Sequence, residues 1–327
     1  MDLLVPLLGG FVLLVLGGEL LVRGAVRVAE RLGMSPLLIG LTLVGFGTSM
    51  PELVTSVQAA RAGSPGIAVG NIVGSNIANI LLVRDRAACL LRMAVPGAAL
   101  RCDGARVVGT AAMLAFLGLV GPLDRVAGAV FLTGLAVYLV YAWREERAAV
   151  GGHTAAFERA EALREVHPQI GSEADTARPG WLLPLGMALA GLVLVVLGGR
   201  FLVEGAIGLA RNLGVSESVI GLTIVAVGTS LPELVTSVVA ALRRHADVSL
   251  GNVLGSCIYN VLGIGGITGL ISPTVVPPEI ARFDSPVMVA ASVLLLVFAW
   301  TGLRIGRREG ACLLAGYVAY VWAVWPH

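Results

Sequence analysis

Two glutamates, Glu52 and Glu233, occupy the same position in a segment that occurs twice in the chain. Residues 47–56 read Gly-Thr-Ser-Met-Pro-Glu-Leu-Val-Thr-Ser, and residues 228–237 repeat them with Leu in place of Met. Both copies lie inside long apolar stretches, where a bilayer would be deepest and a carboxylate costs about 2.5–3.5 kcal/mol. Because the chain carries this cost twice, we expect the two carboxylates to face each other and to form a site for a cation.

The residues before each glutamate add further oxygen donors to such a site. Proline has no N–H, so Pro51 and Pro232 each free the carbonyl four residues earlier, at Gly47 and Gly228, where glycine would let the backbone bend. Irregular backbone is tolerated at this depth only where it lines a cavity or is buried in protein. Calcium takes six to eight oxygen ligands in flexible geometry, and two carboxylates balance one divalent charge. The neighbouring hydroxyl groups are those of Thr48, Ser49, Thr229 and Ser230.

A second polar segment follows each copy of the first. It reads Gly-Asn-Ile-Val-Gly-Ser-Asn-Ile-Ala-Asn over residues 70–79 and Gly-Asn-Val-Leu-Gly-Ser-Cys-Ile-Tyr-Asn over residues 251–260. One Ser and two Asn of each copy recur every fourth residue and therefore share a helical face. We predict ligand or near-ligand roles for the Ser and the second Asn, whereas hydrogen bonding between helices or helix capping explains the first Asn equally well. The four predicted ligands are Ser75, Asn79, Ser256 and Asn260, and the two first asparagines are Asn71 and Asn252.

The composition is that of a polytopic α-helical membrane protein. Hydrophobic residues make up 57% of the chain and charged residues 13%, against about 25% charged in soluble domains, and the mean hydropathy is +0.88. Apolar runs long enough to span a bilayer recur along the whole chain. The first of them lacks the basic region that precedes the apolar run of a signal peptide, so we expect a membrane helix there.

The hydropathy pattern predicts ten membrane spans. They cover residues 3–29, 35–61, 66–91, 106–122, 126–143, 181–209, 217–242, 248–271, 285–303 and 309–326. The polar run Arg84-Asp85-Arg86 interrupts the second half of the third span.

Internal repetition defines the domain organisation. Residues 16–56 align without a gap on residues 197–237, an offset of 181, with 25 identities in 41 positions. We therefore divide the chain into a first membrane repeat (1–143), a linker (144–180) and a second membrane repeat (181–327). Five spans in each repeat make the second repeat enter the membrane from the opposite side. Inverted repeats of this kind are a recurring transporter design, with the substrate site near the midplane at their interface.

The arginines predict the orientation of the chain. All 23 basic residues are Arg. We assign eighteen of them, Arg23 and Arg27 included, to loops that follow odd-numbered spans, and four to loops that follow even-numbered spans. Because arginine collects on the cytoplasmic side, the odd loops and the linker 144–180 are expected in the cytoplasm and both termini outside.

The four motifs resemble the two alpha-repeats of the cation/calcium exchanger superfamily, and most of all its prokaryotic sodium/calcium exchanger branch. The resemblance covers nearly the whole chain. It implies ten helices in two inverted five-helix repeats and antiport of sodium against calcium by alternating access at the inner (plasma) membrane, typically three Na⁺ for one Ca²⁺, with spans one and six sliding across the rest. It also implies a central calcium site of Glu52, Glu233, Thr48 and Thr229, and sodium sites completed by Ser49, Ser230, Ser75, Ser256, Asn79 and Asn260.

The chain departs from the family pattern in places. Cys257 stands where the first repeat has Asn76, and because a thiol is a poor ligand for either ion we expect no essential role there. Asn260 occupies a position that some relatives fill with Asp, which argues against a potassium-dependent subtype. Glu19 aligns with Arg200, and we expect both near a helix end in structural roles.

A calcium/proton exchanger of the same fold is the main alternative, because midplane glutamates can also carry protons. Such relatives usually have a Glu inside the second motif, where this chain has Ser75 and Ser256. A cation channel or a sensor is disfavoured, because the pseudo-symmetry is antiparallel within one chain. No nucleophile–base arrangement or nucleotide loop indicates an enzyme. We expect Ca²⁺ and Na⁺ as substrates in a lipid bilayer, with no cofactor, no nucleic acid and no obligate protein partner.

Overall fold

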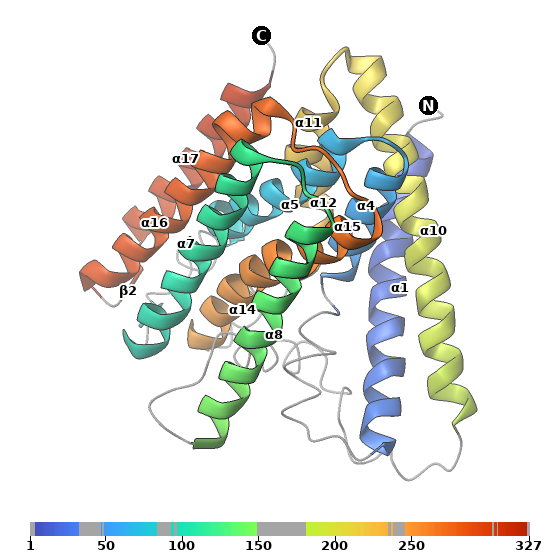
Figure 1. The fold of residues 1–327 in the computed structure, drawn as a ribbon, viewed down its shortest axis with the longest axis horizontal. Coiled ribbons are helices and arrows are strands. Elements are labelled where there is room, and N and C mark those ends of the chain that lie inside the picture. The colour runs from blue at the N-terminus through green and yellow to red at the C-terminus, as the bar shows by residue number, and fades with distance from the viewer. Residues whose placement is uncertain are drawn as a thin grey trace.

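The computed structural model describes residues 4–32, 47, 49–83, 93–94, 97–148, 181–234, 237, 246–302, 304–305 and 307–325, and nearly all of these residues are helical (Figure 1). The first half of the chain contains α1 (Leu4–Arg31), α4 (Met50–Arg61), α5 (Pro65–Ala78), the π-helix η2 (Asn79–Val83), β1 (Met93–Ala94), α7 (Gly97–Val120) and α8 (Arg125–Ala148). The second half contains α10 (Leu182–Leu213), α11 (Glu217–Ile220), η4 (Gly221–Val225), α12 (Ala226–Thr229), α14 (Ala246–Ile258), η5 (Tyr259–Gly265), α15 (Gly266–Ile271), η6 (Ile280–Asp284), α16 (Ser285–Gly302), β2 (Arg304–Ile305) and α17 (Arg307–Val324).

Seven segments of the described chain are long and apolar enough to cross a membrane: 4–29, 65–82, 103–120, 125–144, 182–213, 251–271 and 280–298. They confirm the predicted spans one, three, four, five, six, eight and nine. The segments 65–82 and 251–271 are almost wholly buried, whereas α1 and α10 are mostly exposed. The two helices that carry the second motif therefore lie at the centre of the molecule. The tripeptide 84–86 lies outside the described residues, as does most of the linker.

Helices α1 and α10 form an antiparallel pair along one side of the molecule (Figure 1). Their backbones approach closely at glycines spaced seven residues apart. A Cβ atom added at any of these six positions would lie 2.3–2.9 Å from a backbone atom of the other helix, so only glycine permits this packing. The glycines are Gly10, Gly17 and Gly24 on α1 and Gly191, Gly198 and Gly205 on α10.

The position of Glu19 and Arg200 corrects one prediction. Both residues lie well inside α1 and α10 and not near a helix end. Glu19 pairs with Arg23 one turn later in α1, and Arg200 pairs with Glu204 in the same way in α10. Arg23, which we assigned to the first loop, therefore belongs to the helix.

Short backbone pairings join the two repeats at both ends of the molecule. β1 pairs antiparallel with β2 at one end. At the other end, the Leu123 N–H donates to the Thr274 carbonyl at 2.9 Å and the Thr274 N–H donates to the Leu123 carbonyl at 3.1 Å. Helix α7 runs from the first pairing to the second, and α16, which packs against it, runs back. The fourth helices of the two repeats are thus antiparallel, as inverted repeats require.

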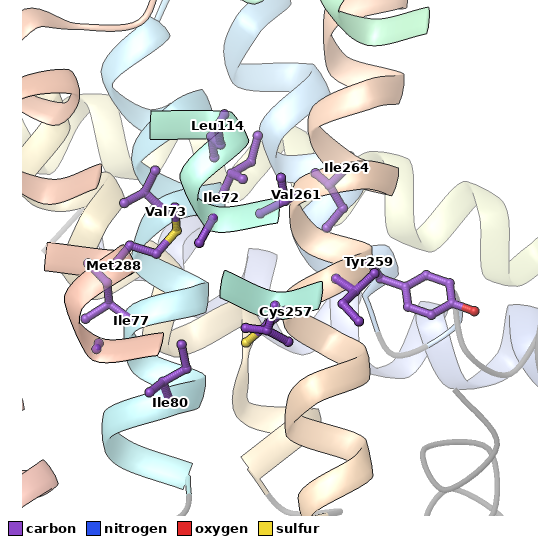
Figure 2. Packing of buried hydrophobic residues seen from close by; sticks show 14 of the residues in the cluster. Ile72, Val73, Ile77, Ile80, Leu114, Cys257, Tyr259, Val261, Ile264 and Met288 are labelled. Carbon is purple, nitrogen blue, oxygen red and sulfur yellow. The ribbon is translucent and has the colours of Figure 1, made fainter. Parts of the chain in front are cut away.

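The main apolar core lies between the central helices and the fourth helices. Ile72, Val73 and Ile77 of α5 pack in one buried cluster with Leu114 of α7 and Met288 of α16 (Figure 2). The polar residues of the second motif occupy other positions of the same helix. One side of α5 is therefore fixed in the core, and its polar side is available to the site.

A buried aspartate anchors the fourth helix to the fifth in each repeat. In the first repeat Asp103 forms an ion pair with Arg106, whose guanidinium lies 4.1 Å from the ring centroid of Tyr141 in α8. In the second repeat the Tyr320 hydroxyl of α17 donates to Asp284 at 2.8 Å. The two aspartates are 181 residues apart, so the internal symmetry extends beyond the motifs.

Candidate cation site

The helical segment that carries each glutamate begins directly after a residue whose backbone conformation interrupts the helix. Ser49 has φ −85° and ψ 9°, and Ser230 has φ −81° and ψ 4°, so neither residue is helical. Pro51 and Pro232 follow in the first turn after the break, where a proline removes no helical hydrogen bond. The prolines therefore start the two binding segments at equivalent positions.

The glycines of the first motif have a different role from the one we predicted. The breaks fall two residues after Gly47 and Gly228 and not at the glycines themselves. A Cβ atom on Gly47 would lie 2.1 Å from Cγ2 of Val22, and one on Gly228 would lie 2.0 Å from Cε1 of Phe11. Both clashes are with α1, so the glycines let α1 pack against the two segments that carry the glutamates.

Each glutamate is hydrogen-bonded by a serine from the other repeat. Ser49 donates its hydroxyl to Oε1 of Glu233 at 3.1 Å, and Ser230 donates to Oε1 of Glu52 at 3.1 Å. All four side chains are at most 3% exposed. The internal symmetry relates the two bonds, which bring the two carboxylate-bearing segments together at the centre of the fold.

Asn71 connects three parts of the site. Its Nδ2 donates to the backbone carbonyl of Glu52 at 3.1 Å and to Oγ of Ser56 at 3.0 Å. Its Oδ1 accepts a hydrogen bond from the Thr229 hydroxyl at 3.0 Å. The first asparagine of the motif therefore joins α5 to α4 and to the other repeat, which supports the hydrogen-bonding interpretation of this position.

Asn252 makes the matching contacts in the second repeat. Its Nδ2 donates to the backbone carbonyl of Glu233 at 3.2 Å and to Oγ of Ser237 at 2.8 Å. Among the described residues its Oδ1 has no partner. Thr48, which aligns with Thr229, lies outside the described residues.

Four further side chains of the predicted site are buried with unsatisfied polar atoms. Within the described part of the chain, no hydrogen-bond partner is present for Oγ of Ser75 and Ser256 or for either amide atom of Asn79 and Asn260. Each such group costs about 1–3 kcal/mol, so these atoms fit a site that a polar ligand fills. Asn79 opens η2 and Asn260 lies in the first turn of η5, and π-turns of this kind are frequent at functional sites.

The predicted ligands therefore lie on helices that contact one another. The central helix α5 packs against α4, α12, α14 and η5. Thr48 is the one predicted ligand outside the described residues. Our sequence reasoning missed Ser56 and Ser237, which receive the asparagine bonds, although their exact repetition at the end of the first motif could have indicated them.

A multi-pass membrane protein with two inverted repeats is the class that this fold defines. The sequence profile described as Sodium/calcium exchanger protein matches residues 3–144 and 183–325. The chain belongs to the sodium/calcium exchanger protein family.

The most similar relatives span nearly the whole chain. It is 36% identical to the Putative antiporter CaxA of Alkalimonas amylolytica, covering 95% of each chain. It is also 36% identical to the Sodium/calcium exchanger MaX1 of Methanosarcina acetivorans, covering 96% of each. Among solved structures, the sodium-calcium exchanger NCX_Mj soaked with 10 mM Na⁺ and zero Ca²⁺ matches 99% of each chain at 30% identity with a TM-score of 0.62. The fold is therefore the sodium/calcium exchanger fold of two inverted five-helix repeats.

Proposed function

We propose that the protein is a secondary active antiporter that exchanges Na⁺ for Ca²⁺ across the plasma membrane by alternating access. The substrate site is built on Glu52 and Glu233 at the interface of the repeats. The observation that carries this proposal is the pair of symmetric bonds from Ser49 and Ser230 to the opposite glutamates. These bonds support the proposal because they join buried polar side chains of the two repeats around the two carboxylates.

The charge of the site favours a divalent cation. Ser49 and Ser230 hydrogen-bond the two carboxylates with neutral hydroxyl groups, and two ionised carboxylates in low dielectric repel each other. One Ca²⁺ balances both charges, and hard oxygen donors are the ligands it prefers. We infer that Thr48, Thr229 and the two serines line the calcium position.

The remaining polar groups suit sodium. The buried oxygens of Ser75, Ser256, Asn79 and Asn260 are neutral, and neutral oxygens suit a monovalent ion. A site with two negative charges holds one Ca²⁺ or part of the sodium load, but not both. If only loaded forms change sides readily, the two ions must cross in opposite directions.

The names of the relatives support this assignment. MaX1 and NCX_Mj are sodium/calcium exchangers, and CaxA is a putative antiporter. We further propose that the repeats 1–143 and 181–327 move as the two inverted units, with the linker 144–180 in the cytoplasm and both termini outside.

Calcium uptake into sodium-loaded proteoliposomes tests the function. We expect uptake that requires the outward sodium gradient, that stops when choline replaces sodium, and that persists with a proton ionophore once voltage is clamped. Uptake that ignores sodium and follows an imposed pH gradient would instead indicate calcium/proton exchange, with the same two glutamates as proton carriers.

A further inference from the structure

An exposed ion pair lies on α10, a helix at the outer edge of the molecule (Figure 1). Arg200 donates from Nε to Oε1 of Glu204 at 2.8 Å. The two side chains are 69% and 53% exposed. A guanidinium has five N–H donors, and within the described residues the other four have no acceptor. The pair is therefore incompletely satisfied within one chain.

The packing of α1 against α10 shows how deep this pair lies. In the close backbone contacts between the two helices, the two residue numbers add to 208 or 212, as for Gly10 with Gly198 and with Leu202, so residues whose numbers add to about 210 lie at the same height. The repeats are offset by 181, so the symmetry centre falls between residues 195 and 196 of α10. Inverted repeats place this centre at the bilayer midplane.

Both charges therefore fall inside the hydrocarbon. At a rise of about 1.5 Å per residue, Arg200 lies about 7 Å and Glu204 about 13 Å from the midplane, and the hydrocarbon extends about 15 Å to each side. Charges at this depth almost always face protein or a water-filled cavity, because lipid cannot solvate them.

The surroundings of the pair are not those of a water-filled cavity. Exposed apolar side chains continue along the same helix, including Leu189, Val193 and Leu197. A water-filled entrance would be lined by polar residues, whereas this surface is apolar up to the ion pair.

The spacing of the exposed residues is that of a helix–helix seam. Positions alternate by four and three residues, the pattern of two helices packed side by side. Small residues at one end of the seam allow close approach, and a Cβ atom on Gly186 would meet nothing within 4 Å. The seam consists of Gly186, Ala190, Val193, Leu197, Arg200 and Glu204.

We propose that this seam is the interface with a second copy of the chain, related by a two-fold axis perpendicular to the membrane. The ion pair is self-complementary, since each copy brings one cation and one anion. Arg200 already spans one helical turn to reach its own Glu204 and can reach Glu204 of the partner subunit at the same height. Four charges then form a closed ring that satisfies donors left open in one chain.

The equivalent pair on α1 explains why the interface involves α10. Glu19 and Arg23 align with Arg200 and Glu204 with the charges exchanged. Their side chains are 33% and 32% exposed, so the chain itself covers much of this pair. A partner is needed only on the α10 side.

Single-molecule photobleaching of the full-length, fluorescently tagged protein in lipid vesicles tests the proposal. We expect two bleaching steps for the unaltered chain. The variant Glu204→Arg should give one step, because like charges then meet in the seam. The double variant Arg200→Glu/Glu204→Arg should restore two steps, since the exchanged pair is equally self-complementary.

Disulfide crosslinking provides a second readout in a chain whose four cysteines are replaced by alanine. Val193→Cys lies in the seam, and Val137→Cys is a control on the exposed face of α8. We expect a crosslinked dimer only with the former. One bleaching step at every protein-to-lipid ratio, or equal crosslinking at both positions, would overturn the proposal and leave the ion pair facing lipid.

Discussion

At the residue scale, the site rests on two carboxylates that each accept a hydrogen bond across the repeat interface. Ser49 and Ser230 are separated from the glutamates they contact by most of the chain, but the bonds are equal in length. A serine hydroxyl is neutral, so it orients a carboxylate without cancelling its charge. Orientation by serine and neutralisation by the transported cation are therefore separate roles.

Replacing either serine by alanine tests this separation. Ser49→Ala and Ser230→Ala each remove one hydrogen bond to an ionised group, worth about 1.5–3 kcal/mol. We expect each variant to need about tenfold or more additional calcium for half-maximal exchange, with similar effects from the two because their geometry is symmetric. The measurement is the calcium dependence of uptake in proteoliposomes.

A matched control is Ser292→Ala. This serine is equally buried and donates to the Met288 carbonyl within α16, away from the site. Its replacement should leave the calcium dependence unchanged. If Ser292→Ala shifted the calcium dependence as much as the site variants do, the shift would reflect a general loss of stability and not the loss of a bond to a glutamate.

We predict that the first asparagine of each second motif stabilises the packing of the central helices. Asn71→Asp keeps the shape of the side chain but presents an oxygen to the Glu52 carbonyl, where an amide now donates. Leaving this buried carbonyl unsatisfied costs about 1–3 kcal/mol. We expect a lower thermal unfolding midpoint in detergent. An unchanged midpoint would show that the bridge does not hold α5 to α4.

The sequence allowed prediction of the site residues but not of their pairing. Glutamates, hydroxyls and asparagines repeat in identical order, so their types and spacing predicted them as candidates. That Ser49 reaches Glu233 and not Glu52 depends on how the two repeats pack, which no local pattern contains. Ser56 and Ser237 were missed because only the repetition of the first motif indicated them, and no local pattern identifies the partner of a serine within a helix.

At the element scale, glycine controls how helices approach. The six glycines at the contact between α1 and α10 leave no room for a side chain. Gly47 and Gly228 let α1 pack against the segments that carry the two glutamates. Our prediction attributed the latter two to backbone bending, because glycine beside proline usually indicates a bend. We attribute the interruption of the helix to proline, because the non-helical residue lies just before the helical turn that contains the proline.

Gly24→Ala tests the packing of α1 against α10. Alanine is favoured over glycine in a helix by about 1 kcal/mol, but here its Cβ would lie 2.4 Å from the backbone nitrogen of Ala188. We expect the clash to prevail and to lower the unfolding midpoint by several degrees. The measurement is thermal unfolding of the purified protein.

Gly9→Ala and Gly109→Ala are the controls, because a Cβ at either position meets nothing within 4 Å. Both should unfold at an equal or slightly higher temperature. If Gly24→Ala behaved like these controls, the close contact between the helices would not exist.

The sequence also allowed prediction of most membrane spans, since apolar length alone identifies them. It failed for Glu19 and Arg200, which we placed near helix ends because charged residues usually mark them. Helices α1 and α10 continue through these charges, because each charge is paired one turn away on its own helix. An ion pair between residues four apart on one helix does not depend on tertiary packing, so the spacing of the charges in the sequence could have indicated it.

At the scale of the whole molecule, the inverted repeats make the two sides of the membrane equivalent in architecture. Counterpart helices α7 and α16 run in opposite directions, and each half of the site has a matching half. Such a molecule can present one site to either side by exchanging the conformations of its repeats, which is the basis of alternating access.

If three Na⁺ exchange for one Ca²⁺, transport moves one net positive charge per cycle. That charge is worth about 2.3 kcal/mol per 100 mV. In sodium-loaded vesicles we expect an inside-positive potential of this size to raise the equilibrium calcium accumulation about fifty-fold. The measurement is uptake at potentials set with valinomycin and potassium. Accumulation that does not depend on potential would contradict this stoichiometry.

The measurement that tests the central claim most directly is calcium exchange by Glu52→Gln and by Glu233→Gln. Each change keeps the size of the side chain and removes one of the two charges that a divalent cation needs. We predict that exchange falls by at least about a hundredfold in each variant, while both proteins remain folded in the membrane with normal unfolding midpoints. Normal exchange by either folded variant would contradict a site built on two carboxylates.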